Sequence, residues 1–202
     1  MTDKTWGYVT PGIPDAWFEK NGVPLTKEEV RCLTICKARL QSTSVIYDIG
    51  AGTGSIAIEA ALLAGAGTVY AIEKNKRAGE LILRNAGRFG VNNLHVVVGE
   101  APEALGGLPL ADRIFVGGSG GRLKEILAAA AEKLRDRGRL VVNAVTIETL
   151  AASVQTLAAL GFGEIETLCL NVARVEQAGQ ARVWKGMNPV YLVAGQKTND
   201  GA

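Results

Sequence analysis

Short apolar runs alternate along this chain with longer runs whose apolar positions recur at helical spacing. The short runs, which are too short for helices, lie at residues 45–49, 68–72, 95–98, 113–116 and 139–144. The helical runs lie at residues 55–64, 74–89, 123–134 and 147–160. The alternation is typical of consecutive βα units and predicts a parallel sheet covered by helices on both faces.

The two ends of the chain depart from this alternation. Residues 1–25 form a loop-rich arm whose aromatic side chains we expect to pack on the domain, although capping a ligand or docking a neighbouring subunit are alternatives. A helix should begin near Thr26, because Thr26 and Glu29 match a capping box. Extended runs at 164–174 and 187–194 have no helix between them and should form an antiparallel pair. Seven strands with a terminal hairpin give an α/β fold of the class I methyltransferase type, with a Rossmann-like, mostly parallel sheet.

Composition narrows the class of protein without naming a partner. The 202 residues fit a single domain, residues 1–202, and a net charge of +2 gives no strong attraction to nucleic acid or to an anionic membrane. No apolar segment is long enough to span a bilayer, and no signal-like start is present. The odd number of cysteines favours a reducing cytoplasm. Cys32 and Cys36 lack a second ligand pair, so we interpret them as small apolar residues and expect no metal site.

A glycine-rich turn between the first strand and the next helix is the clearest sign of a ligand site. Gly50, Gly52 and Gly54 alternate with Ala51 and Thr53. Residues without a Cβ let backbone N–H groups approach a ligand closely and let the chain adopt positive φ. A nucleotide-like ligand should lie at this turn.

Polar or glycine-rich features also follow the next three strands, where ligands lie in open α/β sheets. Glu73 ends the second strand and could accept the hydroxyls of a ribose, Glu100 and Ala101 follow the third strand and could contact an adenine, and both carboxylates could instead be solvated charges. Asp48, before the turn, would repel a pyrophosphate but attract the ammonium group of S-adenosylmethionine. It could instead only stabilise the turn.

Two further features suggest chemistry that we do not favour. His95, the lone histidine, begins an apolar strand and is interpreted as structural, so no catalytic residue is assigned. Residues 188–191 resemble the Asn-Pro-Pro-Tyr motif of RNA and DNA amino-methyltransferases, but that motif belongs after the fourth strand. We interpret Asn188 and Pro189 as the entry to a strand.

Three stretches carry a more specific resemblance, at residues 10–15, 99–105 and 112–121. Together they resemble the decarboxylating cobalt-precorrin-6B C15-methyltransferase family of cobalamin biosynthesis, over nearly the whole chain. The resemblance implies methylation of C15 and loss of carbon dioxide from the C12 acetate of cobalt-precorrin-6B or precorrin-6B, a tetrapyrrole substrate. It also implies a homo-oligomer, with a tetramer suggested. The rival functions are a methyltransferase acting on RNA or protein and a non-catalytic nucleotide-binding module.

The resemblance also implies the site residues. S-adenosylmethionine would be bound by a set drawn from four segments: Thr26, Gly50, Ala51, Gly52, Thr53, Gly54, Glu73 and Ala101. Glu73 and Glu100 stand where Asp is frequent in the family, which should change reach and keep the charge.

The substrate carries many carboxylates, so basic side chains should bind it. The candidates lie after the fourth strand or in the terminal hairpin, and each could instead be a solvated charge: Arg122, Arg174, Arg182 and Lys185. The glycine-rich loop after the fourth strand would let a flat ring approach the methyl group, and its residues are Gly117, Gly118, Ser119, Gly120 and Gly121.

Overall fold

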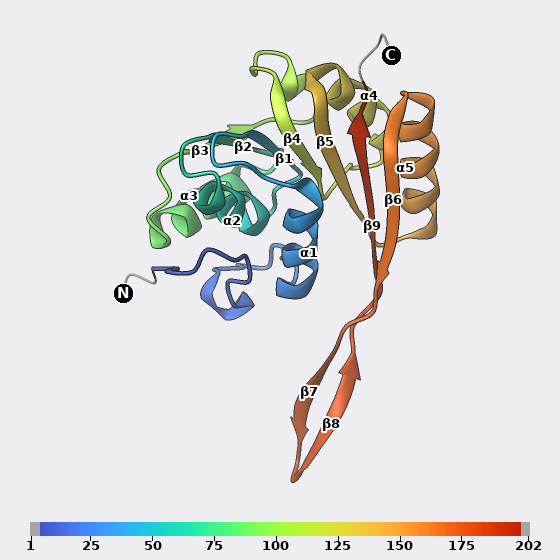
Figure 1. Ribbon diagram of the computed structural model, residues 1–202. Coiled ribbons are helices and arrows are strands. Elements are labelled where there is room, and N and C mark those ends of the chain that lie inside the picture. Colours follow the sequence, from blue (N-terminus) through green and yellow to red (C-terminus); the bar gives the residue numbers. More distant parts are fainter. Residues whose placement is uncertain (1–4, 199–202) are drawn as a thin grey trace.

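A seven-stranded sheet with helices on both faces forms the body of the protein, in a computed structural model that describes residues 5–198 (Figure 1). The strands of this sheet are β1 (Val45–Ile49), β2 (Thr68–Glu73), β3 (Leu94–Val98), β4 (Ala111–Val116), β5 (Leu134–Ala144), β6 (Phe162–Leu170) and β9 (Val190–Lys197). The helices are α1 (Glu28–Ala38), α2 (Ser55–Leu63), α3 (Lys76–Arg88), α4 (Leu123–Lys133) and α5 (Ile147–Ala159), with 3-10 turns η1 (Asp15–Trp17) and η2 (Glu103–Leu105). β9 runs antiparallel to β5 and β6, while the pairs from β3 through β5 are parallel. The predicted α/β class and the antiparallel pair at the end of the chain are confirmed.

Side chains that alternate along the central strands divide the core into two layers. Ile46 of β1 and Phe115 of β4 pack with α1, α2, α3 and the N-terminal arm. Their neighbours Tyr47 and Ile114 pack on the other face with α4 and α5. Successive strand residues point to opposite faces, so a strand buried on both faces has the continuous apolar sequence seen here.

The strand order places the point where the chain reverses direction across the sheet between β1 and β4. The order is β3-β2-β1-β4-β5-β9-β6, so β2 and β3 lie on one side of β1 while β4 and β5 lie on the other. Ligands of open α/β sheets bind beside the carboxyl ends of the strands at such a switch point.

The capping box predicted at the start of α1 is wrong. The N-cap residue is Lys27, which makes no side-chain cap. Asp15 from the arm takes this role, since its Oδ1 accepts the Glu28 N–H at 2.9 Å. Glu29 does not turn back to the helix start, because both its carboxylate oxygens are bound to Arg174, at 2.7 and 2.6 Å.

Two other boundaries differ from the predicted ones. α3 begins at Lys76 rather than at residue 74, because the Asn75 side chain caps it by accepting the N–H groups of Arg77 and Ala78. Leu134, which the helical spacing placed in α4, begins β5 and is buried.

A separate two-stranded ribbon, missed from the sequence, projects away from the body (Figure 1). It consists of β7 (Ala173–Ala178) and β8 (Ala181–Gly186), which are antiparallel. The extended run predicted at 164–174 is therefore two strands, because β6 ends at Leu170. Nearly every ribbon side chain is exposed, so no burial pattern marked the ribbon in the sequence.

The described part of the arm packs on the helices. Phe18 is buried against the ring of Phe89, and Trp6 and Trp17 pack against the same core, which confirms the packing interpretation for these residues, whereas Tyr8 is exposed. Residues 1–4 of the arm lie outside the described residues. No helix within residues 5–198 is long and apolar enough to cross a membrane.

Three smaller interpretations remain. His95 is exposed on β3, with its ring 5.6 Å from that of Tyr70, and its interpretation as structural stays a prediction. Of the two cysteines interpreted as small apolar residues, Cys32 is partly buried and Cys36 is exposed. Asn188 and Pro189 directly precede β9, which confirms their place at a strand entry.

Candidate active site

A cavity of about 700 Å³ opens at the carboxyl ends of the central strands, and we call it the main cavity. Its lining includes the glycine turn, the end of β2, the segment after β3, the loop after β4 and the end of the arm, through these residues: Gly22–Lys27, Asp48–Gly52, Glu73, Glu100, Ala101, Gly117–Gly120 and Asn143. A side cavity of about 200 Å³ shares part of that wall. Four of the strand-end features predicted from the sequence therefore meet around one space.

Two glycines of the turn are required by close contacts with neighbouring backbone. Gly50 has φ +75°, and a Cβ there would lie 2.7 Å from the backbone nitrogen and oxygen of Gly118. A Cβ on Gly52, which has φ +56°, would lie 3.1 Å from the Pro24 carbonyl oxygen. The turn is thus held between the loop after β4 and the end of the arm, with its backbone open to the cavity.

Asp48 is buried beneath the turn with few partners. It is 1% exposed, and its Oδ2 accepts the Ala57 N–H at 3.1 Å. Loss of hydration raises the pKa of Asp48 to about 7; the Ala57 N–H opposes this shift, and the Glu73 charge adds to it. No cation among residues 5–198 forms an ion pair with it. The Ala57 N–H belongs to the first turn of α2, so Asp48 links β1 to the start of that helix, and its roles toward the glycine turn and toward an ammonium group stay predictions.

Glu73 organises the backbone at the edge of the main cavity. Its Oε2 accepts the Gly52 N–H at 3.0 Å and its Oε1 accepts the Asn75 N–H at 2.9 Å. One carboxylate thus joins the glycine turn to the start of α3. Glu100 lies farther along this edge, half exposed and 3.3 Å from Lys74 Nζ, while Ala101 is buried.

Several residues predicted to bind the cofactor or the substrate line neither cavity. Thr53 points its hydroxyl into the protein, where Oγ1 is buried and has no partner among the described residues. Arg122 is held by Glu103 and Glu125 at 2.6 to 2.8 Å. Arg182 and Lys185 lie on the projecting ribbon, where Lys185 pairs with Glu176 at 2.9 Å. The role of these basic residues toward a substrate remains a prediction.

Polar residues of the main cavity that were missed from the sequence include two lysines and an asparagine. Lys27 and Lys74 are the basic side chains among its described lining. Asn143 lies near the end of β5 and lines both cavities. The strand-end rule that identified Glu73 and Glu100 applies equally to the fifth strand and would have found Asn143.

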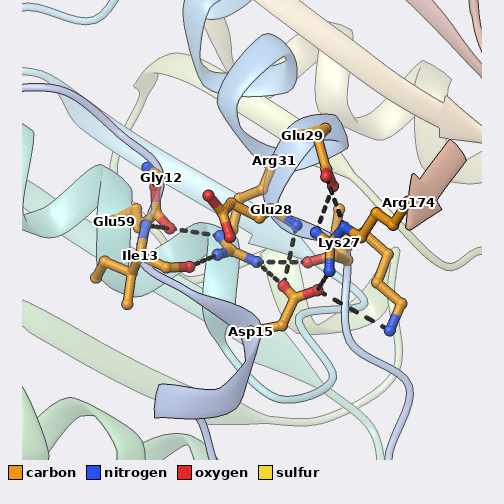
Figure 2. Close-up of polar contacts among 10 residues, drawn as sticks. Gly12, Ile13, Asp15, Lys27, Glu28, Glu29, Arg31, Glu59 and Arg174 are labelled. Atoms are coloured by element: carbon orange, nitrogen blue, oxygen red, sulfur yellow. Dashed lines mark hydrogen bonds and ion pairs between the residues drawn. The ribbon is translucent and has the colours of Figure 1, made fainter. Parts of the chain in front are cut away.

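A cluster of three buried charged residues, Asp15, Arg31 and Glu59, was also missed from the sequence (Figure 2). Arg31 is fully buried, and its Nε donates to Glu59 Oε1 at 2.5 Å. Its Nη1 donates to Asp15 Oδ1 at 3.3 Å and to the Thr26 carbonyl at 2.5 Å, while Nη2 donates to the Ile13 carbonyl. The guanidinium thus fixes Thr26, which lines the main cavity.

Glu59 fastens the arm to α2 in the same cluster. Its Oε2 accepts the Gly12 N–H at 2.8 Å and its Oε1 accepts the Ile13 N–H at 3.0 Å. Figure 2 shows Arg174 approaching the outer side of the cluster, with Nη1 3.5 Å from Asp15 Oδ2. The arm motif at residues 10–15 therefore has a structural use, because its backbone satisfies a buried charge.

No group of three or more His, Cys, Asp and Glu side chains in the part of the chain that the structure describes could hold a metal ion.

Comparison with known proteins gives consistent matches over nearly the full chain. A family model described as "Precorrin methyltransferase domain" matches residues 16–197. A relative from Pyrobaculum calidifontis, named "Probable cobalt-precorrin-6B C(15)-methyltransferase (decarboxylating)", is 46% identical over 192 residues, covering 94% of this chain and 97% of the relative.

Two solved structures are also similar. The precorrin-6y C5,15-methyltransferase of Geobacter metallireducens superposes with a TM-score of 0.88 at 39% identity, covering 94% of this chain and 100% of that one. The precorrin 8w decarboxylase of Methanobacterium thermoautotrophicum superposes with a TM-score of 0.84 at 39% identity, covering 91% of this chain and 98% of that one.

Proposed function

The chain belongs to the precorrin methyltransferase family, and we propose that it works as one methyltransferase domain that methylates C15 of cobalt-precorrin-6B or precorrin-6B. It removes carbon dioxide from the C12 acetate of the same substrate. The observation that carries this proposal is the main cavity at the switch point, walled by the glycine turn and Glu73, in a chain 46% identical to a relative of that name.

S-adenosylmethionine is the methyl donor that fits this cavity. The turn offers backbone where Cβ atoms at Gly50 and Gly52 would collide with neighbours. Asp48, buried with no cationic partner among the described residues, suits the ammonium of a methionine moiety, and Glu73 at the end of β2 suits ribose hydroxyls. Glu100 and Ala101 would border the adenine, and Thr26 would line the opposite wall.

The donor supplies an activated methyl group, so the residues of this chain need only bind, orient and exclude water. Positioning of this kind can lower a barrier by about 7–11 kcal/mol. Methyl transfer to C15 releases one proton from the ring. Loss of carbon dioxide from C12 sends an electron pair into the conjugated ring and takes up one proton, so the two steps together need no oxidant or reductant.

The substrate is a broad, flat polyanion, and two parts of the cavity wall suit it. The loop from Gly117 to Gly121 has few side chains and faces the glycine turn, so it can lie against a ring. Lys27 and Lys74 offer ammonium groups for peripheral carboxylates.

We also propose a homo-oligomer in which the projecting ribbon contacts a second copy of the chain. Val175, Val183 and Trp184 are 48%, 44% and 75% exposed on this ribbon. An isolated two-stranded ribbon is marginally stable in water, so a partner would stabilise it. Sedimentation should show an assembly, which Trp184→Ser weakens; a monomer at all concentrations would refute this proposal.

A cytoplasmic location is proposed as well. The three cysteines are free, as expected where thiols are kept reduced.

The direct test is to incubate the protein with precorrin-6B, or its cobalt form, and S-adenosylmethionine, and to measure the mass of the product by mass spectrometry. A product that has gained a methyl group and lost carbon dioxide is expected. A product that has gained only the methyl group would refute the assigned decarboxylase activity. A substrate whose mass does not change would refute the proposed function.

Cofactor binding can be tested separately by calorimetry with S-adenosylhomocysteine. Glu73→Ala should bind at least tenfold more weakly than the native chain, because the variant loses an acceptor for the ligand and the Gly52 N–H loses its partner. Glu80→Ala is the matched control, since Glu80 is exposed on α3 and lines neither cavity. Equal affinity of Glu73→Ala and Glu80→Ala would overturn the assignment of Glu73.

A further inference from the structure

The side cavity differs in chemistry from the main cavity that it adjoins. Its apolar walls are the side chains of Val116, Leu123, Val142 and Val145. None of the described residues that line it is charged. Arg122, which precedes the lining residue Leu123 in the sequence, forms ion pairs with Glu103 and Glu125. The main cavity, in contrast, includes carboxylates and two lysines in its lining.

Neutral hydrogen-bond donors remain in the side cavity. Asn143 Oδ1 lies 2.9 Å from the Thr34 hydroxyl, whose single proton also has the Val30 carbonyl within 2.7 Å, and no described residue accepts a hydrogen bond from the Asn143 NH₂ group. The Thr149 N–H donates to Thr146 Oγ1 at 3.1 Å, and the Thr146 hydroxyl donates to Thr149 Oγ1 at 3.0 Å. The hydroxyl proton of Thr149 is thus left for an acceptor in the cavity.

We propose that the side cavity is the subsite that holds the substrate carboxylate lost as carbon dioxide. This inference rests on the proposed function and adds the place where one of its two steps occurs. The cavity shares Gly117, Gly118, Ser119, Asn143 and Val145 with the main cavity, so one ring can reach both. C12 and C15 are separated in the macrocycle by C13 and C14, so one bound ring can present C15 to the main cavity and the C12 acetate to the side cavity.

The size and polarity of the cavity suit this step. About 200 Å³ has room for a short carboxylate side chain or a few waters. Asn143 and Thr149 can orient the carboxylate, but they provide no counter-charge to hold the electron pair on it. With the ring lying over the mouth of the cavity, a carboxylate there is moved from water into surroundings without a counter-charge and is destabilised, whereas the neutral carbon dioxide and delocalised pair that form from it are not. The bond to the carboxylate carbon breaks, its electron pair enters the conjugated ring, carbon dioxide leaves and a proton from solvent completes the methyl group at C12.

Charge variants of Thr149 test the subsite, because Thr149 lines the side cavity and not the main one. With precorrin-6B and saturating S-adenosylmethionine, Thr149→Lys should lower KM and slow carbon dioxide release, each by about tenfold, since the new cation binds and stabilises the carboxylate. Thr149→Glu should raise KM by about tenfold. The isosteric Thr149→Val should raise KM several-fold, and it keeps the proposal testable if a charged variant does not fold.

The control places the same charge outside the cavity. Ile147 lies in the same turn of α5, is 71% exposed and lines neither cavity, so Ile147→Lys should leave KM and carbon dioxide release within twofold of the native values. Affinity for S-adenosylhomocysteine should be unchanged in all four variants.

Each outcome decides between the two ideas. If the native chain methylates and decarboxylates but KM does not follow the sign of the charge at residue 149, the subsite is wrong and the function stands. Faster carbon dioxide release by Thr149→Lys would also overturn it, because the step would then gain from a counter-charge. If the native chain neither adds a methyl group to the substrate nor removes carbon dioxide from it, the proposed function fails and the subsite fails with it.

Discussion

Two buried carboxylates on successive elements of this protein, Asp48 of β1 and Glu59 of α2, have opposite surroundings. Each is 1% exposed. Glu59 accepts two backbone N–H groups and pairs with Arg31, which is itself fully buried. Asp48 accepts one backbone N–H, and no described cation pairs with it. A carboxylate with all its partners inside the fold belongs to the architecture, whereas one with spare acceptor capacity beside a cavity is available to a ligand.

The different surroundings also give the two carboxylates different effects on the stability of the fold. The interactions of Glu59 fix the arm, α1 and α2 relative to one another, and through Arg31 they fix the wall at Thr26. Asp48 costs stability when it is ionised, because burial raises its pKa to about 7. A bound ammonium would offset that cost, so the two sites should respond in opposite directions to substitution.

Removing Arg31 should have the largest effect. Arg31→Met leaves Glu59 buried without its cation and removes the fully buried cation partner of Asp15, and we expect the free energy of unfolding to fall by about 3–5 kcal/mol, measured by urea denaturation. The matched control is Arg84→Met, whose ion pair with Glu19 is half exposed and should contribute less than about 1 kcal/mol. Equal losses in the two variants would mean that the cluster is no more than a surface ion pair.

Replacing each of the two carboxylates by its neutral amide should change the free energy of unfolding in opposite directions at pH 8. Glu59→Gln removes the charge that pairs with Arg31 and should destabilise by about 2–3 kcal/mol. Asp48→Asn keeps an acceptor for the Ala57 N–H but removes the buried charge. Since burial raises the pKa of Asp48 from 3.8 to about 7, this substitution should stabilise by at most about 4 kcal/mol.

The pH dependence of the free energy of unfolding tests whether ionised Asp48 destabilises the fold. Because the folded protein holds this proton more tightly than the unfolded chain, the contribution is present below about pH 4 and is lost as the pH rises to about 7. The difference in unfolding free energy between Asp48→Asn and the native chain should therefore disappear near pH 4. A stabilisation that does not change with pH would exclude ionisation as its cause.

The sequence predicted the position of the main cavity because its signals are local. Each strand is a short apolar run, and the carboxyl ends of parallel strands meet at one edge, so Glu73 and Glu100 could be placed from their positions alone. Asn143 obeys the same rule, and applying it to only four strands left Asn143 out.

The cluster and the ribbon could not be predicted in this way, because their signals are not local. Asp15, Arg31 and Glu59 come from an arm and two helices, and only the fold brings them together. The one available sign was a charged residue, Glu59, within the apolar run at 55–64. In the ribbon both faces are exposed, so its strands lack the alternation that burial imposes.

A smaller effect is expected on the affinity for S-adenosylhomocysteine, which has the same ammonium group. If that group pairs with ionised Asp48, binding requires loss of the proton below about pH 7. Affinity measured by calorimetry should then fall by at most about tenfold per pH unit as the pH is lowered from 7 to 5. Asp48→Asn should bind more weakly at pH 8 and show no such slope; a native-like slope in this variant would assign the titration to another group.

The smallest effect should come from Arg174, where the buried cluster meets solvent. Arg174 binds Glu29 through two hydrogen bonds, which lower the pKa of that carboxyl, and lies 3.5 Å from Asp15, but its side chain is 40% exposed and that of Glu29 is 38% exposed. Exposed pairs contribute little, so Arg174→Gln should reduce the free energy of unfolding by less than about 1 kcal/mol. The reduction should also shrink in 1 M salt, which screens solvated charges over about 3 Å, whereas the loss in Arg31→Met should persist. A salt-independent loss of several kcal/mol in Arg174→Gln would extend the structural cluster into the ribbon, because only a charge left buried and unpaired is that costly.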